Sequence, residues 1–251
     1  MKISIITTCF NREVTIRDCI ESLLSQDYPD IEYIIVDGAS TDRSLSIINE
    51  YKDRIATIIS EPDKGMYEAL NKGIRVATGE VIGLLHSDDF LYATDTISHI
   101  AQALENSQAD FIYGDGLFVE SDHTDKVVRN WISGYYTKRK VRRGWLPLHP
   151  TCYIRKDVME KWGLYDESFR IAADSEFLVR YLYEADLKVC YLPKYIVRMR
   201  MGGLSTDPQK MKLKWAEDLR LYRQHGFHAY WALGCKIASK IPQFVSAKLK
   251  K

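Results

Sequence analysis

The fold is indicated best by residues 31–42, whose sequence is Ile31-Glu32-Tyr33-Ile34-Ile35-Val36-Asp37-Gly38-Ala39-Ser40-Thr41-Asp42. Residues 31–36 are a nearly continuous apolar run, which is typical of a strand covered on both faces of a parallel sheet. Residues 37–42 are small, polar and acidic, as expected where a strand ends and the chain turns. The run from Ile3 to Cys9 is also β-rich. The sequence therefore predicts an α/β protein that begins with a buried strand.

Strand and helix patterns alternate through the first third of the chain. The predicted helices have apolar residues at three- and four-residue spacing, whereas the predicted strands are short apolar runs. This βαβαβαβ order predicts a mostly parallel sheet with helices on its faces, joined by right-handed crossovers. The strands are predicted at residues 3–9, 31–36, 55–60 and 81–85, and the helices at 13–26, 43–51 and 66–77.

The remainder of the chain is less regular, and it predicts a mixed sheet followed by a helical tail. The two apolar runs that flank Asp122-His123 predict a hairpin. A basic stretch at residues 138–143 is interpreted as a loop. Helices are predicted at residues 95–105, 156–162 and 174–184, with two more after Gln209 that separate near Gly226, and strands at 111–113, 117–119, 126–131, 188–192 and 196–199.

The composition excludes several classes of protein. A formal net charge of +1 over 251 residues argues against a binder of nucleic acid that works through overall charge. The five cysteines include no Cys-x-x-Cys pair, which argues against a disulfide framework and a zinc site. No stretch approaches the ~20 apolar residues of a membrane-spanning helix. We therefore expect a cytoplasmic protein, with any membrane contact being peripheral.

Acidic residues follow three of the predicted strands. Asp37 and Asp42 follow the second strand, Asp63 follows the third, and Asp88-Asp89 follow the fourth. Because the carboxyl ends of parallel strands meet at one edge of a sheet, these carboxylates are expected to lie together. A divalent cation would offset their mutual repulsion. Each acid taken alone has another explanation as a helix cap or turn residue.

Seven segments of the chain, three of them from its second half, occur in the same order as the motifs of a known family. Together they closely resemble the motifs of family-2 glycosyltransferases, which have the GT-A fold. The resemblance extends over about residues 1–207. The segments are Ser4 to Arg12, Val36 to Asp42, Asp63 to Gly73, Leu84 to Asp89, His149 to Thr151, Gly163 to Glu167 and Ala172 to Phe177.

The resemblance implies how a nucleotide-sugar donor is bound. Thr7 and Asp37 are expected to contact the nucleotide base, with Asp37 accepting a hydrogen bond from a ring N–H. Asp63 is expected to border the same base pocket. Asp88 is expected to lie near the ribose. The resemblance favours uracil as the base, with guanine and thymine as the alternatives.

The resemblance also implies a metal ligand, a catalytic base and an acceptor contact. Asp89 is expected to bind Mg²⁺ or Mn²⁺, and Ser87 stands where many relatives have a further Asp, so the donor diphosphate would supply most of the metal's ligands. Asp174 matches the catalytic base, although its position alone fits a helix N-cap at least as well. His149 is expected to line the acceptor pocket.

The activity implied is transfer of a sugar, with inversion, from a UDP-sugar to an acceptor hydroxyl. One base and one face of attack imply a single displacement. The acceptor is expected to be a glycan, lipid-linked, in the synthesis of a surface polysaccharide such as O-antigen, capsule or exopolysaccharide. The alternative is a non-catalytic subunit of the same fold that binds nucleotide or glycan and assembles with partners.

The domain organisation follows from the extent of the resemblance. Residues 1–207 are expected to form the GT-A domain, with a nucleotide-binding half at about 1–90 and an acceptor half at about 91–207, and residues 208–251 a helical extension. From Tyr230 onward, aromatic and apolar residues alternate with lysines. This pattern suits either an anionic membrane surface or packing back onto the domain. Pro242 would interrupt a helix there.

Overall fold

The computed structural model describes residues 1–202, 210–239 and 243. Its first part alternates strands and helices in the predicted order. β1 pairs in parallel with both β2 and β4, and β2 pairs in parallel with β3. The elements are β1 (Ile3–Cys9), α1 (Ile16–Leu24), β2 (Ile31–Asp37), α2 (Ser44–Asn49), a 3₁₀ turn (Lys52–Arg54), β3 (Thr57–Ser60), α3 (Met66–Val76) and β4 (Val81–Leu84).

The second part extends the same sheet with strands of both directions. β8 and β7 pair antiparallel with β6, whereas β9 runs parallel to it. The elements are β5 (Phe90–Leu91), α4 (Thr96–Ser107), β6 (Phe111–Val119), β7 (Val127–Trp131), α5 (Lys138–Arg142), a 3₁₀ turn (His149–Thr151), β8 (Tyr153–Arg155), α6 (Lys156–Trp162), α7 (Ala173–Val179), a π-helical turn (Arg180–Glu184), β9 (Val189–Arg200), α8 (Met211–Gln224) and α9 (Ala229–Ala238).

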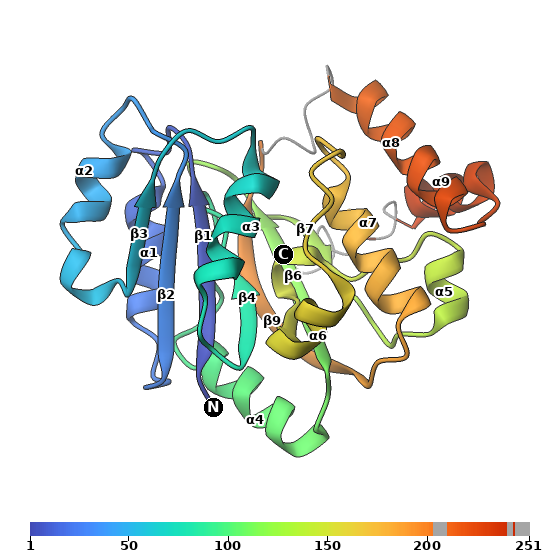
Figure 1. Ribbon diagram of the computed structural model, residues 1–251, viewed down its shortest axis with the longest axis horizontal. Helices are drawn as coiled ribbons and strands as arrows, with labels where there is room; N and C mark the ends of the chain where they lie inside the picture. Colours follow the sequence, from blue (N-terminus) through green and yellow to red (C-terminus); the bar gives the residue numbers. More distant parts are fainter. Residues whose placement is uncertain (203–209, 240–242, 244–251) are drawn as a thin grey trace.

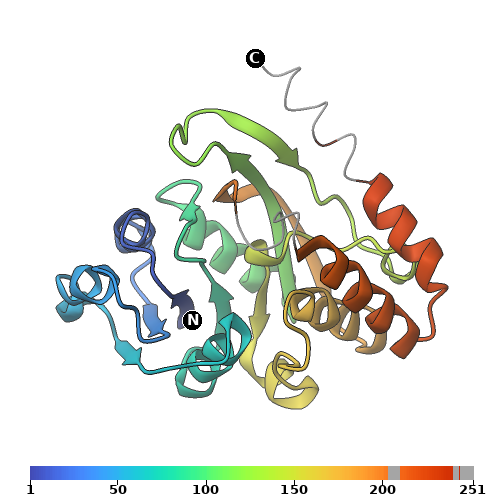
Figure 2. The same cartoon turned by 90° about the horizontal axis from the view of Figure 1, so that it is seen from above.

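The described residues thus form one nine-stranded sheet in the order β3-β2-β1-β4-β8-β6-β9-β5, with β7 added to β6. Figure 1 shows this mostly parallel, twisted sheet with helices on both faces, and Figure 2 shows the same layers from above. The predicted fold class, GT-A-like α/β with a helical C-terminal end, agrees with this architecture. None of the described helices is long and apolar enough to cross a membrane. All five cysteines lie in the described residues as free thiols.

The structure corrects several details of the second half. Residues 111–119 form a single strand rather than two, because Gly114 and Gly116 interrupt the apolar pattern without interrupting the strand. A Cβ at Gly116 would lie 2.3 Å from Cδ2 of Leu148, so glycine is what allows this close packing. Likewise β9 is continuous, and Pro193 lies where its register against β6 shifts.

Two other elements differ from the prediction. The basic stretch interpreted as a loop contains the short helix α5, whose N-cap Thr137 accepts a hydrogen bond from the backbone N–H of Lys140. β8 has only 3 residues, which is too short for a periodic pattern to predict.

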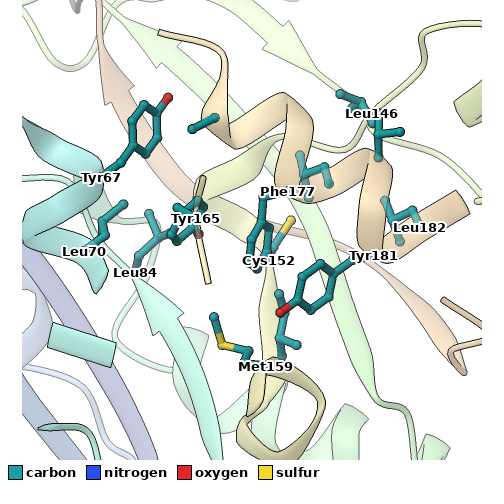
Figure 3. Packing of buried hydrophobic residues seen from close by; sticks show 14 of the residues in the cluster. Tyr67, Leu70, Leu84, Leu146, Cys152, Met159, Tyr165, Phe177, Tyr181 and Leu182 are labelled. Carbon is teal, nitrogen blue, oxygen red and sulfur yellow. The ribbon is translucent and has the colours of Figure 1, made fainter. Parts of the chain in front are cut away.

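The buried apolar residues form a cluster on each side of the sheet. In the first cluster the Phe177 ring of α7 stacks on Tyr165 and on Tyr181, with ring centroids 4.3 and 4.1 Å apart (Figure 3). Tyr222 of α8 and Ala232 of α9 belong to this same cluster and are fully buried. The C-terminal helices therefore share the core of the preceding chain and lie beside α7 (Figures 1 and 2). The predicted boundary at 207 falls outside the described residues.

Gly83 of β4 offers a test of the packing. A Cβ at this position would lie 2.3 Å from the ring of Tyr153, which is fully buried. We expect Gly83→Ala to lower the free energy of unfolding by about 1–3 kcal/mol, as overpacking typically does. Urea unfolding with a common slope measures this change.

Gly234 of α9 provides the matched control. In the described structure nothing lies within 4 Å of a Cβ added there. Gly234→Ala should raise stability by roughly 0.5–1 kcal/mol, because alanine is the better helix former. Equal stability of Gly83→Ala and the wild-type protein would show that Tyr153 moves aside.

Candidate functional site

A cavity of about 1090 Å³ opens beside the carboxyl ends of β1 and β4. One part of its wall comes from residues after β1 and β4 and from the start of α3, and another from β7, the 3₁₀ turn at His149, and α7 to α9. The sequence-predicted site residues Asp63, Asp88, Asp89, His149 and Asp174 all line this cavity. The structure therefore brings together acids that are far apart in the sequence.

Asp89 is the most deeply buried of the acids that line the cavity. Its side chain is 2% exposed, and Oδ1 accepts a hydrogen bond of 3.0 Å from the backbone N–H of Arg200. Oδ2 is buried and has no hydrogen-bond partner among the described residues. Burial, and then the charge of Asp88, raise the pKa of Asp89 well above its usual value. An unpartnered carboxylate oxygen on a residue of the cavity wall is suited to a cation.

Arg200, at the end of β9, fastens this acidic loop to the second half of the sheet. Its guanidinium donates a 2.8 Å hydrogen bond to the backbone oxygen of Asp88 and forms an ion pair with Asp18 of α1. It also lies over the ring of Phe90, 5.0 Å from the centroid.

Asp37 and Asp63 lie next to each other at the ends of β2 and β3. Asp37 is fully buried, and its Oδ2 accepts hydrogen bonds from the backbone N–H of Ser40 at 3.1 Å and from Ser60 Oγ at 2.8 Å. A Cβ on Gly38 would lie 2.5 Å from Asp63 Oδ2, so the two acids are close. Burial raises the pKa of Asp63. Asp63 lines the cavity, whereas Asp37 is not among the described residues of its wall.

Thr7 also lies outside the described wall of the cavity. Its side chain is fully buried, and its Oγ1 accepts a 3.2 Å hydrogen bond from Tyr33 and lies 3.8 Å from Cys19 Sγ of α1. The next residue, Thr8, does line the cavity. The reason is the pleat of β1, which turns neighbouring side chains to opposite faces. The position of Thr7 is thus beside the site, and its role in donor binding stays a prediction.

Asp174 occupies the first turn of α7 and is half-buried. Its Oδ1 accepts a 2.6 Å hydrogen bond from the backbone N–H of Ser175. The N-cap of this helix is Ala172. The alternative interpretation of Asp174 as the N-cap is therefore wrong. Its charge acts on both His86 and His149. Asp174 therefore lies within electrostatic reach of the loop that carries Asp88.

His149 lies in the wall between these groups. It is 7% exposed, and its Nε2 is 2.8 Å from the hydroxyl of Tyr165. Burial lowers the pKa of His149 to about 4, with the charge of Asp174 opposing this shift and His86 adding to it. The ring is therefore neutral near pH 7. One of its nitrogens can donate a hydrogen bond and the other can accept one.

Several cations of the wall were not singled out from the sequence. Lys236 of α9 donates to Asp218 Oδ1 at 2.8 Å and to Ser175 Oγ at 2.9 Å. Burial opposes its charge, but Tyr222, Asp218 and Asp174 together raise its pKa. Lys214 of α8 and Arg129 of β7 also line the cavity. No sequence signal distinguished these residues from solvated basic residues of a helical tail or hairpin.

This mixed α/β sheet, with a large cavity beside the carboxyl ends of β1 and β4, has the architecture of the GT-A fold. The family model for glycosyl transferase family 2 matches residues 4–162, more than half of the chain. The chain belongs to glycosyl transferase family 2.

Named relatives agree with this family. The chain is 28% identical over 207 residues to a PGL/p-HBAD biosynthesis glycosyltransferase of Mycobacterium bovis, covering 80% of this chain and 78% of the relative. It is 31% identical over 237 residues to the uncharacterized glycosyltransferase EpsJ of Bacillus subtilis, covering 89% of this chain and 67% of the relative.

Solved structures show the same fold at lower identity. Residues 1–349 of TarS from S. aureus superpose with a TM-score of 0.67 at 19% identity, covering 88% of this chain, which spans 64% of that fragment. A complex of TarS 1–349 with UDP-GlcNAc gives a TM-score of 0.66 at 21% identity, covering 87% of this chain and 67% of that one. The mannosyltransferase PcManGT from Pyrobaculum calidifontis, in complex with GDP-Man and Mn²⁺, gives a TM-score of 0.63 at 16% identity, covering 94% of this chain and 73% of that one.

The low pKa of His149 predicts a pH dependence of stability. Between its usual pKa of 6.5 and its folded value of about 4, the unfolded chain binds a proton that the folded chain does not. The stability that the folded protein gains from keeping His149 neutral is therefore fully present above pH 6.5 and is lost as the pH falls toward 4. We expect the stability difference between the wild-type protein and His149→Gln to change by up to roughly 3 kcal/mol across this interval.

Urea unfolding at several pH values measures this difference, and His123→Gln serves as the control because His123 is exposed. Parallel pH curves for the wild-type protein and His149→Gln would contradict the assignment.

Proposed function

We propose that this glycosyltransferase moves a sugar from a nucleoside-diphosphate sugar, with UDP-sugars the first candidates, to an acceptor hydroxyl with inversion at the anomeric carbon. The observation that carries the proposal is that Asp89 and Asp174, from separate elements, line one cavity, while Asp89 Oδ2 has no partner among the described residues. The solved neighbours in complex with UDP, UDP-GlcNAc and GDP-Man support a donor of this class.

The donor is proposed to bind at the carboxyl ends of β1, β2 and β4. Asp37 would accept a hydrogen bond from a ring N–H of the base, in exchange for one it now accepts from Ser40 or Ser60. Asp63 would border the base, and Asp88 the ribose. Thr7 is proposed to contribute through its backbone, because its side chain is turned toward α1.

The residues of the site fit a divalent metal held largely by the donor. Within the described ranges, no three His, Cys, Asp or Glu side chains are grouped so as to hold an ion by themselves. Asp89 alone offers a buried carboxylate oxygen without a described partner. Mg²⁺ commonly binds through one or two carboxylates plus substrate phosphates. When bound, such an ion supplies Lewis-acid stabilisation of the charge that develops on the leaving diphosphate.

Asp174 is proposed to be the general base. Its carboxylate would accept the proton of the acceptor hydroxyl as that oxygen attacks the anomeric carbon and the diphosphate departs. A single displacement of this kind inverts the anomeric centre. Neutral His149, two aromatic rings of the wall (Trp131 and Trp145) and the nearby cations would contact the acceptor.

The acceptor is proposed to be a glycan, lipid-linked, in the synthesis of a surface polysaccharide. The relatives named PGL/p-HBAD biosynthesis glycosyltransferase support a role in a biosynthetic pathway that uses glycosyl transfer. Peripheral membrane contact through the C-terminal tail is part of the same proposal. Among its described residues, Trp231 is 66% and Ile237 is 43% exposed, which suits such contact. Pro242, Phe244 and the residues that follow lie outside the described ones.

Turnover is the test of the proposed function. The purified protein, with Mn²⁺ or Mg²⁺, is incubated with a panel of nucleotide sugars and glycan acceptors. Transfer, or slow hydrolysis of one donor, supports catalysis. If the protein binds nucleotide but shows neither transfer nor hydrolysis with any donor, catalysis is contradicted. The alternative of a non-catalytic binding subunit then replaces it.

Asp174→Asn removes the proposed base without changing its shape. We expect kcat for transfer to fall about 10²–10⁴-fold, the range that general bases contribute. The dissociation constant of the donor, measured by calorimetry, should stay within about twofold, since the donor contacts lie on other elements. A parallel loss of donor affinity would argue against the assignment of Asp174 as base.

Asp89→Asn replaces the carboxylate oxygen proposed to bind the metal by an amide. The retained Oδ1 can still accept the hydrogen bond from Arg200. Losing one charge-assisted contact costs about 1.5–3 kcal/mol, which corresponds to tenfold or more in affinity. We expect donor affinity to weaken by that factor when Mn²⁺ is present and to change little in EDTA. Equal weakening under both conditions would show that Asp89 does not act through a metal.

A further inference from the structure

The loop that enters α7 is held by a carboxylate from the C-terminal helices. Glu217 of α8 is 7% exposed. Its two oxygens accept hydrogen bonds from three consecutive backbone N–H groups, those of Arg170 at 2.8 Å and of Ile171 and Ala172 at 2.9 Å. Hydrogen bonds to an ionised acceptor are the stronger kind. One side chain thus fixes residues 170–172, which lie directly before α7 and are separated from Asp174 by Ala173 alone.

The same loop is fastened from the nucleotide-binding half. Tyr67 of α3, which is 5% exposed, donates a 2.9 Å hydrogen bond to the backbone oxygen of Ile171. Ile171 therefore has its N–H bound to α8 and its carbonyl bound to α3. Because the two anchors come from elements far apart in the sequence, the loop is held relative to both halves of the cavity.

The other side of Asp174 is also tied to α8. Ser175 Oγ accepts a 2.9 Å hydrogen bond from Lys236, which in turn donates to Asp218 at 2.8 Å. Asp218 is 1% exposed and follows Glu217 directly in α8. The neighbouring acids of α8 therefore hold the chain on both sides of Asp174.

We propose that Glu217 is a positioning residue for sugar transfer, which orients Asp174 by fixing residues 170–172. Glu217 is not among the described residues that line the cavity, so it acts through the loop rather than on the substrate. This inference rests on the proposed function, in which Asp174 is the base. It makes α8 a necessary part of the catalytic site.

A carboxylate is required because three donors converge on it. An ionised carboxylate presents only acceptors, whereas the amide of glutamine presents one oxygen and an NH₂ group. In Glu217→Gln at least one backbone N–H would face another donor. The loop would have to shift, and misplacement of a reacting group by about 1 Å can lower a rate about 100-fold.

The experiment compares Glu217→Gln with Glu32→Gln in the full chain. Glu32 is an equally buried carboxylate, 7% exposed, that accepts hydrogen bonds from Lys2, Ser4 and Thr78 at the amino end of the sheet. We expect Glu217→Gln to lower kcat roughly 10- to 100-fold with donor affinity within twofold. Glu32→Gln should lose stability and keep kcat. Amide hydrogen exchange at residues 170–172 should quicken only in Glu217→Gln.

If Glu217→Gln does not fold, Glu217→Asp takes its place, because aspartate keeps the charge but has a shorter side chain. The same loss of kcat, with donor affinity retained and faster exchange at residues 170–172, is expected. If the wild-type protein transfers sugar and kcat is unchanged in the Glu217 variant, the positioning role of Glu217 is overturned but the proposed function is not. An equal loss of kcat in Glu32→Gln or a parallel loss of donor affinity would also overturn that role. Transfer absent already in the wild-type protein would overturn the proposed function, and the role of Glu217 with it.

Discussion

The whole site depends on the parallel pairing of β1 with β2 and β4. Residues of all three strands are almost completely buried, so the strands have no freedom to slide without exposing apolar side chains. This register places the end of β2 and the loop after β4 at the same edge of the sheet. The acids Asp37 and Asp89 are consequently held in the interior at this edge. Asp37 accepts hydrogen bonds there from Ser40 and Ser60, and Asp89 accepts one from the backbone N–H of Arg200.

Burial also explains the electrostatics of the site. Asp89 has a backbone N–H from Arg200 on one oxygen and no described partner on the other, so its environment penalises charge until something positive binds. Around Asp174 the arrangement is different, because Lys214 and Lys236 lie within electrostatic reach of it. A glycosyl transfer of the proposed kind needs two such groups: one that can bind a cation, and one that can accept a proton.

The C-terminal helices belong to the site as much as to the core. α8 and α9 contribute Tyr222 and Ala232 to the buried cluster that contains Phe177, on the helix that carries Asp174. Apolar packing of this cluster therefore determines where the polar groups of α8 fall. The family-2 match ends at residue 162, so both Asp174 and these helices lie beyond the matched segment.

The order of strands and helices in the first half followed from the sequence alone, because hydrophobic periodicity and the acidic turns are local properties of residues 1–89. The gathering of Asp63, Asp88 and Asp89 followed as well, since parallel strands end at one edge. Only the tertiary structure decided that Gly114 and Gly116 lie within one strand, that Thr7 faces α1 while Thr8 faces the cavity, and that Glu217 holds residues 170–172. The physical reason is that these features arise from contacts between residues distant in sequence. Their geometry is set by the close packing of the core, which leaves no periodic signal along the chain.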